Sequence, residues 1–287
     1  MVSIVISSKT PLLLQQVSEN IKETIGVDFE IIAIANPNGE ISICKAYNEG
    51  AEKAKYPYLC FCHEDILFTS QNWGKKQIDY LKNKEIGLIG VSGSCIKPLT
   101  PSGVWLNNYK TDRFYIVQRG AEKEDYLKYS NPNAEIKAEV KIIDGLFMAC
   151  RKEVWEINKF DDKIFTGFHG YDIDFSLQIQ KKHKLFVIYD IELIHFSGGG
   201  NSINWINDMR KIKNKWKHSL PSSTIHFSSK EIKTIEYDAL NYFVRSMISA
   251  KYNLYLTLGY LVRLFFLKPL EFNNLRVIKY LIKNGKY

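Results

Sequence analysis

Hydrophobic and polar positions alternate along the first 91 residues in a way that predicts strands separated by helices. Apolar runs typical of buried strands occupy residues 3–7, 29–35, 58–62 and 86–91. Helical periodicity fills the intervals at residues 11–24, 43–55 and 73–83. Thr10 and Pro11 mark the start of the first helix, and Gly26 marks its end. This alternation predicts βαβ units and a parallel sheet, in which ligands bind where the strands end.

The pattern changes in the middle of the chain. Residues 97–138 are polar with weak periodicity, and they predict an excursion from the core that serves as a substrate loop. Residues 140–151 return to a strand pattern, and a helix at 175–182 and a strand at 185–188 follow. From residue 237 onward the pattern predicts long helices. We therefore divide the chain into a core domain, 1–202, and a helical extension, 203–287.

Composition and charge narrow the function classes. Of 287 residues, 45% are hydrophobic and 24% charged, which is typical of a folded protein and excludes a disordered chain or a disulfide scaffold. The net charge is +8, but residues 203–287 carry 15 Lys/Arg against 5 Asp/Glu, while residues 1–202 carry 24 against 26. Because these basic residues are embedded in apolar helices without a known binding module, we expect no nucleic acid partner.

Cysteine usage and the N-terminus indicate a cytoplasmic protein. The five cysteines are odd in number and scattered through apolar segments, as expected of buried free thiols in a reducing compartment: Cys44, Cys60, Cys62, Cys95 and Cys150. The apolar run at residues 1–7 is too short for the core of a signal peptide. No stretch reaches the roughly 18 apolar residues of a membrane span.

Three polar clusters could carry chemistry. His63-Glu64-Asp65 follows the strand at 58–62, where its carboxylates could bind a hard divalent cation or form an exposed turn. Asp172 and Asp174 open a helix and point in different directions, so that one could cap the helix while the other faces a cleft as a general base. His195 precedes Ser197-Gly198-Gly199-Gly200, and it fits either a metal ligand beside a loop or a structural histidine.

Taken in order, these features resemble a known family. The segments that carry the resemblance are Ala46-Tyr47-Asn48-Glu49-Gly50, Ala54 to Phe61, Asp144 to Lys152, and Phe160-Asp161. Together with the acidic triplet, the Asp-rich helix start and the late His, they look like a GT-A glycosyltransferase of the family-two-like, nucleotide-sugar-dependent type. The resemblance covers about residues 1–200. It implies an α/β fold of the GT-A type, a Rossmann-like mixed sheet flanked by helices, with a C-terminal α-helical extension.

The resemblance also implies roles for particular residues. Asp65 matches the last Asp of the family's DxD motif and His195 its late metal-binding His, so the cofactor is expected to be Mn²⁺ or Mg²⁺. Asp172 matches the catalytic base of inverting members. Two further sets are implied, one for the donor and one on the acceptor side: Ser7, Ser8, Asn36, Asn48, His63 and Glu64 for the donor, and Asp144, Gly145, His169, Gly170 and Tyr171 for the acceptor. His63, Asn36 and Tyr171 stand where relatives often have Asp, Asp and Glu.

The implied reaction moves a sugar from a UDP- or GDP-sugar donor to a hydroxyl of a saccharide or lipid-linked saccharide, as in polysaccharide biosynthesis. A nucleotidyltransferase or a degenerate, non-catalytic sugar- or nucleotide-binding module remains an alternative. In the tail, aromatic and aliphatic residues interspersed with Arg and Lys fit helices lying on an anionic membrane as a peripheral contact. Packing on the core or a contact between two copies of the chain is the other interpretation.

Overall fold

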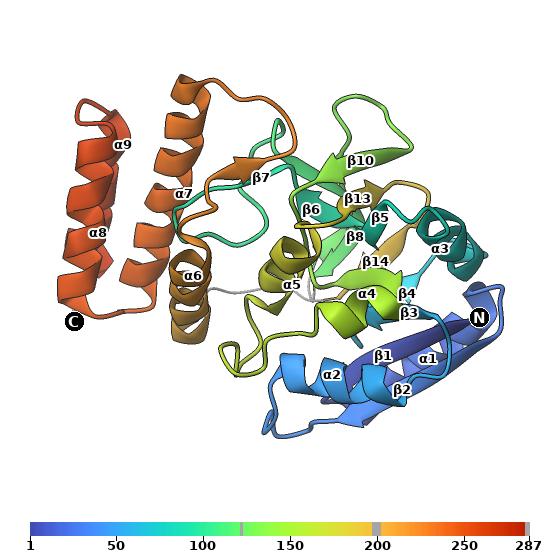
Figure 1. Ribbon diagram of the computed structural model, residues 1–287. Coiled ribbons are helices and arrows are strands. Elements are labelled where there is room, and N and C mark those ends of the chain that lie inside the picture. Colours follow the sequence, from blue (N-terminus) through green and yellow to red (C-terminus); the bar gives the residue numbers. More distant parts are fainter. Residues whose placement is uncertain (121–122, 197–201, 285–287) are drawn as a thin grey trace.

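The computed structural model describes residues 1–120, 123–196 and 202–284 (Figure 1). Within these ranges the largest sheet has seven strands, in the order β10 (Lys137–Val140), β13 (Lys184–Ile188), β5 (Ile86–Gly90), β12 (Phe147–Arg151), β3 (Tyr58–Cys62), β1 (Val2–Ser8) and β2 (Phe29–Ala35). β12 is antiparallel to β3 and β5, and β10 is antiparallel to β13. The other pairs are parallel, including the predicted units β1–β2 and β1–β3.

A second sheet corrects the expectation for residues 97–138. Its order is β11 (Ile142–Ile143), β6 (Ser92–Ser94), β8 (Asp112–Gly120), β14 (Leu193–His195) and β4 (Ile66–Phe68), with β9 (Lys123–Ser130) paired to β8. A small third sheet pairs β7 (Ile96–Lys97) with β15 (Ser222–Ser223). The predicted loop therefore contains a β-hairpin, β8–β9. Its strand β8 takes partners from distant parts of the chain, β6 and β14, and such pairing leaves little trace in local periodicity.

Helices flank the sheets, and several begin where the sequence predicts. They are α1 (Pro11–Thr24), α2 (Ile43–Lys53), α3 (Trp73–Leu81), α4 (Lys152–Ile157), α5 (Tyr171–Ile179), α6 (Ile203–Trp216), α7 (Ser229–Ser249), α8 (Leu254–Leu267) and α9 (Phe272–Asn284). The Ser42 hydroxyl caps α2, and Ser228 with Glu231 forms a capping box on α7. α5 begins four residues before the predicted helix, since Gly170 adopts a left-handed conformation at φ 79° and turns the chain there.

The central sheet is buried on both faces, with alternate side chains directed to opposite sides. Val5 and Phe61 join a core cluster with side chains of α2, α5 and α6. Ile4 and Cys60 join a second cluster with side chains of α1, α3 and β14. All five cysteines are buried free thiols, as predicted.

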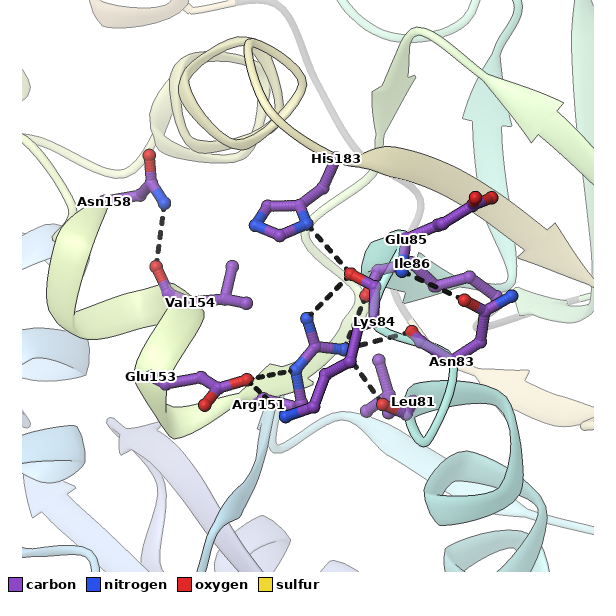
Figure 2. Close-up of polar contacts among 10 residues, drawn as sticks. All are labelled: Leu81, Asn83, Lys84, Glu85, Ile86, Arg151, Glu153, Val154, Asn158 and His183. Atoms are coloured by element: carbon purple, nitrogen blue, oxygen red, sulfur yellow. Dashed lines mark hydrogen bonds and ion pairs between the residues drawn. The ribbon is translucent and has the colours of Figure 1, made fainter.

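Arg151, at the end of β12, ties together the turn between α3 and β5 (Figure 2). Its Nη1 donates hydrogen bonds to the backbone carbonyls of Leu81 at 2.9 Å and Ile86 at 2.7 Å, and its Nε donates to Glu153 at 2.7 Å. The guanidinium also reaches the carbonyls of Asn83 and Lys84, each at 3.2 Å. The buried charge is therefore distributed over several acceptors, which is the usual condition for burying an arginine.

The C-terminal helices form a layer at one end of the molecule, opposite α1 and β2 (Figure 1). α6 packs into the first core cluster through Trp205, Ile206 and Ile212. α7 contributes Phe243 to that cluster, and other side chains of α7 form a separate apolar cluster with α8 and α9. No helix in the described ranges combines the length and apolar character needed to cross a membrane.

Candidate functional site

The triplet His63-Glu64-Asp65 follows β3 at the edge of the sheet where β1 and β2 also end. Glu64 turns toward the loop after β1. Its carboxylate accepts hydrogen bonds from the Ser8 hydroxyl at 2.8 Å and from the backbone N–H groups of Lys9 and Thr10 at 3.1 Å. Glu64 thus holds the loop at the start of α1 in place. His63 and Asp65 instead lie near His195.

His195 joins His63 and Asp65 because β14 pairs with β4. This antiparallel pairing places His195 opposite Ile66, the residue after Asp65. The Asp65 carboxylate oxygens lie 3.6 Å from Nε2 of His195 and 3.7 Å from Nδ1 of His63. One donor atom from each of the three side chains lies within 4.8 Å of the others. Two imidazoles and a carboxylate form a donor set suited to a divalent metal ion.

Hydrogen bonds orient both imidazoles toward this centre. Nδ1 of His195 lies 3.3 Å from Oε1 of Gln118, and Nε2 of His63 lies 2.8 Å from the Tyr171 hydroxyl. The remaining ring nitrogens face Asp65. Nε2 of His195 is buried without a hydrogen-bond partner in the part of the chain that the structure describes. A buried, unpartnered nitrogen aimed at a carboxylate fits a metal ligand, and outer contacts of this kind are what fix such ligands.

The pKa values favour the forms that bind a metal. Burial lowers the pKa of His63, although the charge of Asp65 opposes the change. Burial works against ionisation of Asp65, yet the adjacent imidazoles of His195 and His63 hold the pKa of that carboxyl below its ordinary value. A neutral imidazole beside an ionised carboxylate is ready to coordinate a cation.

α5 directs its two aspartates to opposite sides, as its sequence predicts. Asp174 is buried against α6, where its carboxylate accepts a hydrogen bond from Trp216 at 2.8 Å and pairs with Lys215 at 2.8 Å. Asp172 instead lies beside the loop before β12, where it accepts from the backbone N–H of Gly145 at 3.2 Å. Asp174 therefore holds the fold together, and Asp172 is left facing the cleft.

Burial and the nearby charge of Asp144 raise the pKa of Asp172 to about 7. A carboxyl group with that proton affinity can accept a proton near neutral pH, which is the property required of a general base. Gly145 keeps this corner open, because a Cβ on that residue would stand 1.9 Å from the Tyr171 hydroxyl. The position therefore requires glycine.

A cavity of about 450 Å³ joins the metal-ligand candidates to Asp172. The predicted site residues that line it are His63, Asp65, Asp144, Gly145, His169, Gly170, Tyr171, Asp172 and His195. The cavity is also lined by four residues that the sequence pattern does not predict: Gly103, Val104, and Trp205 and Met209 of α6. Gln118 was missed too, because it lies in the segment that the pattern predicts to be a loop.

The remaining predicted donor residues do not line this cavity. Asn48 is turned inward, where its side-chain amide bonds the backbone of Phe160 and the indole of Trp155. Asn36 is buried, and its amide closes the turn to Ile41. Ser7 and Ser8 end β1. These hydrogen bonds give a structural reason for an asparagine at positions 48 and 36. The donor-binding role of both residues stays a prediction.

Comparison with known proteins decides the family. A family model described as "Glycosyltransferase like family" matches residues 3–218. The chain belongs to this glycosyltransferase-like family. Its match includes the whole of α6, in agreement with the packing of that helix into the core. No curated protein matches the chain.

Solved structures place this family member among GT-A folds. GalNAc-T7, solved with UDP, GalNAc and Mn²⁺, aligns with a TM-score of 0.51 and 13% identity over 83% of this chain and 54% of that protein. The chain thus spans about half the length of this neighbour. A197 from STIV aligns at a TM-score of 0.41 and 16% identity over 68% of this chain and 85% of that protein. The predicted GT-A fold with C-terminal helices is confirmed.

Proposed function

We propose that this glycosyltransferase family member transfers a sugar from a nucleotide-sugar donor to a hydroxyl group of a saccharide or lipid-linked saccharide, with inversion at the anomeric carbon. The observation that carries the proposal is the single cavity that Asp172 shares with His63, Asp65 and His195. One end can hold a cation next to a diphosphate, and the other can accept a proton. The proposed setting is cytoplasmic.

His63, Asp65 and His195 would hold the divalent ion, for which Mn²⁺ and Mg²⁺ are the candidates. A bound cation supplies positive charge to stabilise a departing nucleoside diphosphate. Asp172 would take the proton of the acceptor hydroxyl as the hydroxyl oxygen bonds to the anomeric carbon. The bond from that carbon to the diphosphate oxygen breaks with its electron pair leaving on the diphosphate. A single displacement of this kind inverts the configuration.

The remaining cavity residues would act by position. The Tyr171 hydroxyl orients His63, and the N–H of Gly145 holds the Asp172 carboxylate in place. Burial, together with the charge of Asp144, keeps the pKa of Asp172 near neutral pH, at about 7. His169 and Gly170 would border the acceptor hydroxyl. Burial lowers the pKa of His169, which favours the neutral imidazole there.

The first experiment identifies the donor. UDP- and GDP-sugars are screened by thermal shift with and without Mn²⁺ or Mg²⁺, and a donor that stabilises the protein only with the metal identifies both. The UDP and Mn²⁺ bound to GalNAc-T7 make that pair the first to test. Nucleoside diphosphate release is then measured. If no nucleotide sugar releases its nucleotide, the chain is a non-catalytic binding module and the proposal fails.

A further inference from the structure

α8 is apolar on all of its sides but buried on only one. Its sequence LYLTLGYLVRLFFL contains a single charged residue, Arg263. Thr257, Leu261 and Leu264 are buried on the side that faces α7. Helices with apolar residues around their whole circumference are normally covered around their whole circumference. Among residues 1–120, 123–196 and 202–284, nothing covers the opposite side of α8 as its composition requires.

The uncovered side of α8 carries large side chains in helical register. Tyr255, Val262 and Phe266 recur at spacings of seven and four residues and are 85%, 54% and 80% exposed. A Cβ on Gly259, in the same stripe, would meet no atom within 4 Å. In the turn after α8, Leu270 is also fully exposed, at 101%. Contiguous exposed apolar side chains of this kind mark a contact surface.

α9 adds positive charge to the same outer layer. Arg276, Lys279 and Lys283 recur at spacings of three and four residues and are exposed, while Asn274 and Val277 are buried on the opposite side. The Arg276 guanidinium also lies over the ring of Phe272, with 5.1 Å to the ring centroid. Residues 250–284 contain six Lys or Arg and only one acidic residue, Glu271.

We propose that these exposed residues form a docking surface for an anionic lipid bilayer, and we call them the α8–α9 surface: Tyr255, Val262, Phe266, Leu270, Phe272, Arg276, Lys279 and Lys283. The 14 residues of α8 are too short to cross a bilayer, so the helix would lie along the interface with its aromatic side chains inserted. The α9 cations would contact the acidic headgroups.

Charge distinguishes this occupant from a second copy of the chain. A two-fold contact brings the same surface of each copy together, so it would gather the cations Arg276, Lys279 and Lys283 of both copies in one interface. An anionic membrane instead complements every one of these charges. The surface lies on helices that contribute no residue to the cavity with Asp172, so membrane binding can be tested independently of glycosyl transfer.

The test is flotation of the purified full chain with vesicles of phosphatidylglycerol and phosphatidylcholine, compared with phosphatidylcholine alone. We expect binding to the anionic vesicles, weakened at 0.5 M salt. An apolar variant, Tyr255→Ser with Val262→Ser and Phe266→Ser, should lose it. A charge variant, Arg276→Gln with Lys279→Gln and Lys283→Gln, should bind about 100-fold more weakly, since each basic residue near such a surface contributes about a fivefold change.

Matched controls alter comparable residues elsewhere. Leu12→Ser with Ile157→Ser changes side chains that are 62% and 69% exposed on α1 and α4. Lys22→Gln with Lys53→Gln and Lys75→Gln removes three exposed charges. Both controls should bind anionic vesicles as the wild type does.

Three results would overturn the proposal. The wild type could fail to bind anionic vesicles, or the apolar and charge variants could bind as well as the controls. Light scattering after size exclusion could also reveal that the wild type is a dimer and that only the apolar variant is a monomer. In that case a second copy covers the surface. Nucleotide release by the same preparations separates each result from failure of the proposed transfer reaction.

Discussion

Replacing Asp172 with Asn should abolish transfer and yet stabilise the protein at alkaline pH. The folded state raises the pKa of this carboxyl to about 7, so the folded chain holds a proton there that the unfolded chain has already released. Ionising Asp172 in the fold then costs about 4 kcal/mol, at about 1.4 kcal/mol for each tenfold change in proton affinity. This cost is absent below pH 4, grows between pH 4 and 7, and is complete at pH 8. Asn never ionises, so the variant avoids it.

The assay is urea unfolding of the wild type and Asp172→Asn at pH 4, 6 and 8, followed by tryptophan fluorescence. The two proteins should differ little at pH 4, and the variant should be more stable by about 4 kcal/mol at pH 8. Glu156→Gln, on the exposed side of α4, is the matched control and should show no pH-dependent difference. An Asp172→Asn variant that is no more stable than the wild type at pH 8 would refute the reasoning.

Transfer by the wild type should rise with pH below 7 and level off above it, and Asp172→Asn should reduce kcat by about 100- to 10,000-fold while retaining donor binding. Burial and, after it, the charge of Asp144 raise the pKa of Asp172, so Asp144→Asn should move the midpoint of the pH–rate profile to lower pH. Gln118→Leu should weaken Mn²⁺ binding by about 10- to 100-fold, measured by spin resonance, because it frees the ring of His195. Arg151→Met leaves two buried carbonyls without their donor and should cost about 4 kcal/mol in urea unfolding, whereas Glu153→Gln should cost under about 1 kcal/mol.

Local pattern predicted the first half of the sheet because its elements are set by nearby residues. Apolar runs bounded by turns located β1, β2 and β3, and Pro11 and Gly26 bounded α1. The hairpin of β8 and β9 escaped prediction since its stability comes from pairing with β6 and β14. The role of Gln118 was therefore not predicted either. A glutamine in a strand does not indicate a function until the residue that it contacts, here His195, is known.

The candidate site was predicted in outline, with one residue in an unexpected place. Asp65, His195 and Asp172 line one cavity, as the resemblance implied. The donor contact of His63 stays a prediction, and the structure adds that its Nδ1 faces Asp65 among the metal-ligand candidates. The side-chain amides of Asn48 and Asn36 make structural hydrogen bonds, Asn48 with Phe160 and Trp155 and Asn36 with Ile41, and their role at the donor stays a prediction. Residue type and spacing do not reveal which way a side chain points; the surrounding hydrogen bonds decide it.

The adjacency of Tyr171 and Asp172 has a consequence for how this cavity can change over evolution. The Tyr171 hydroxyl contacts His63 and the next residue, Asp172, contacts Gly145, so two consecutive residues at the start of α5 link the spacing of the cation end to that of the proton-accepting end. These two contacts connect the two halves of the cavity. Loops around the cavity can lengthen or exchange residues to admit new sugars while that spacing stays constant. An insertion between Tyr171 and Asp172, in contrast, would disturb the contacts to His63 and Gly145 together.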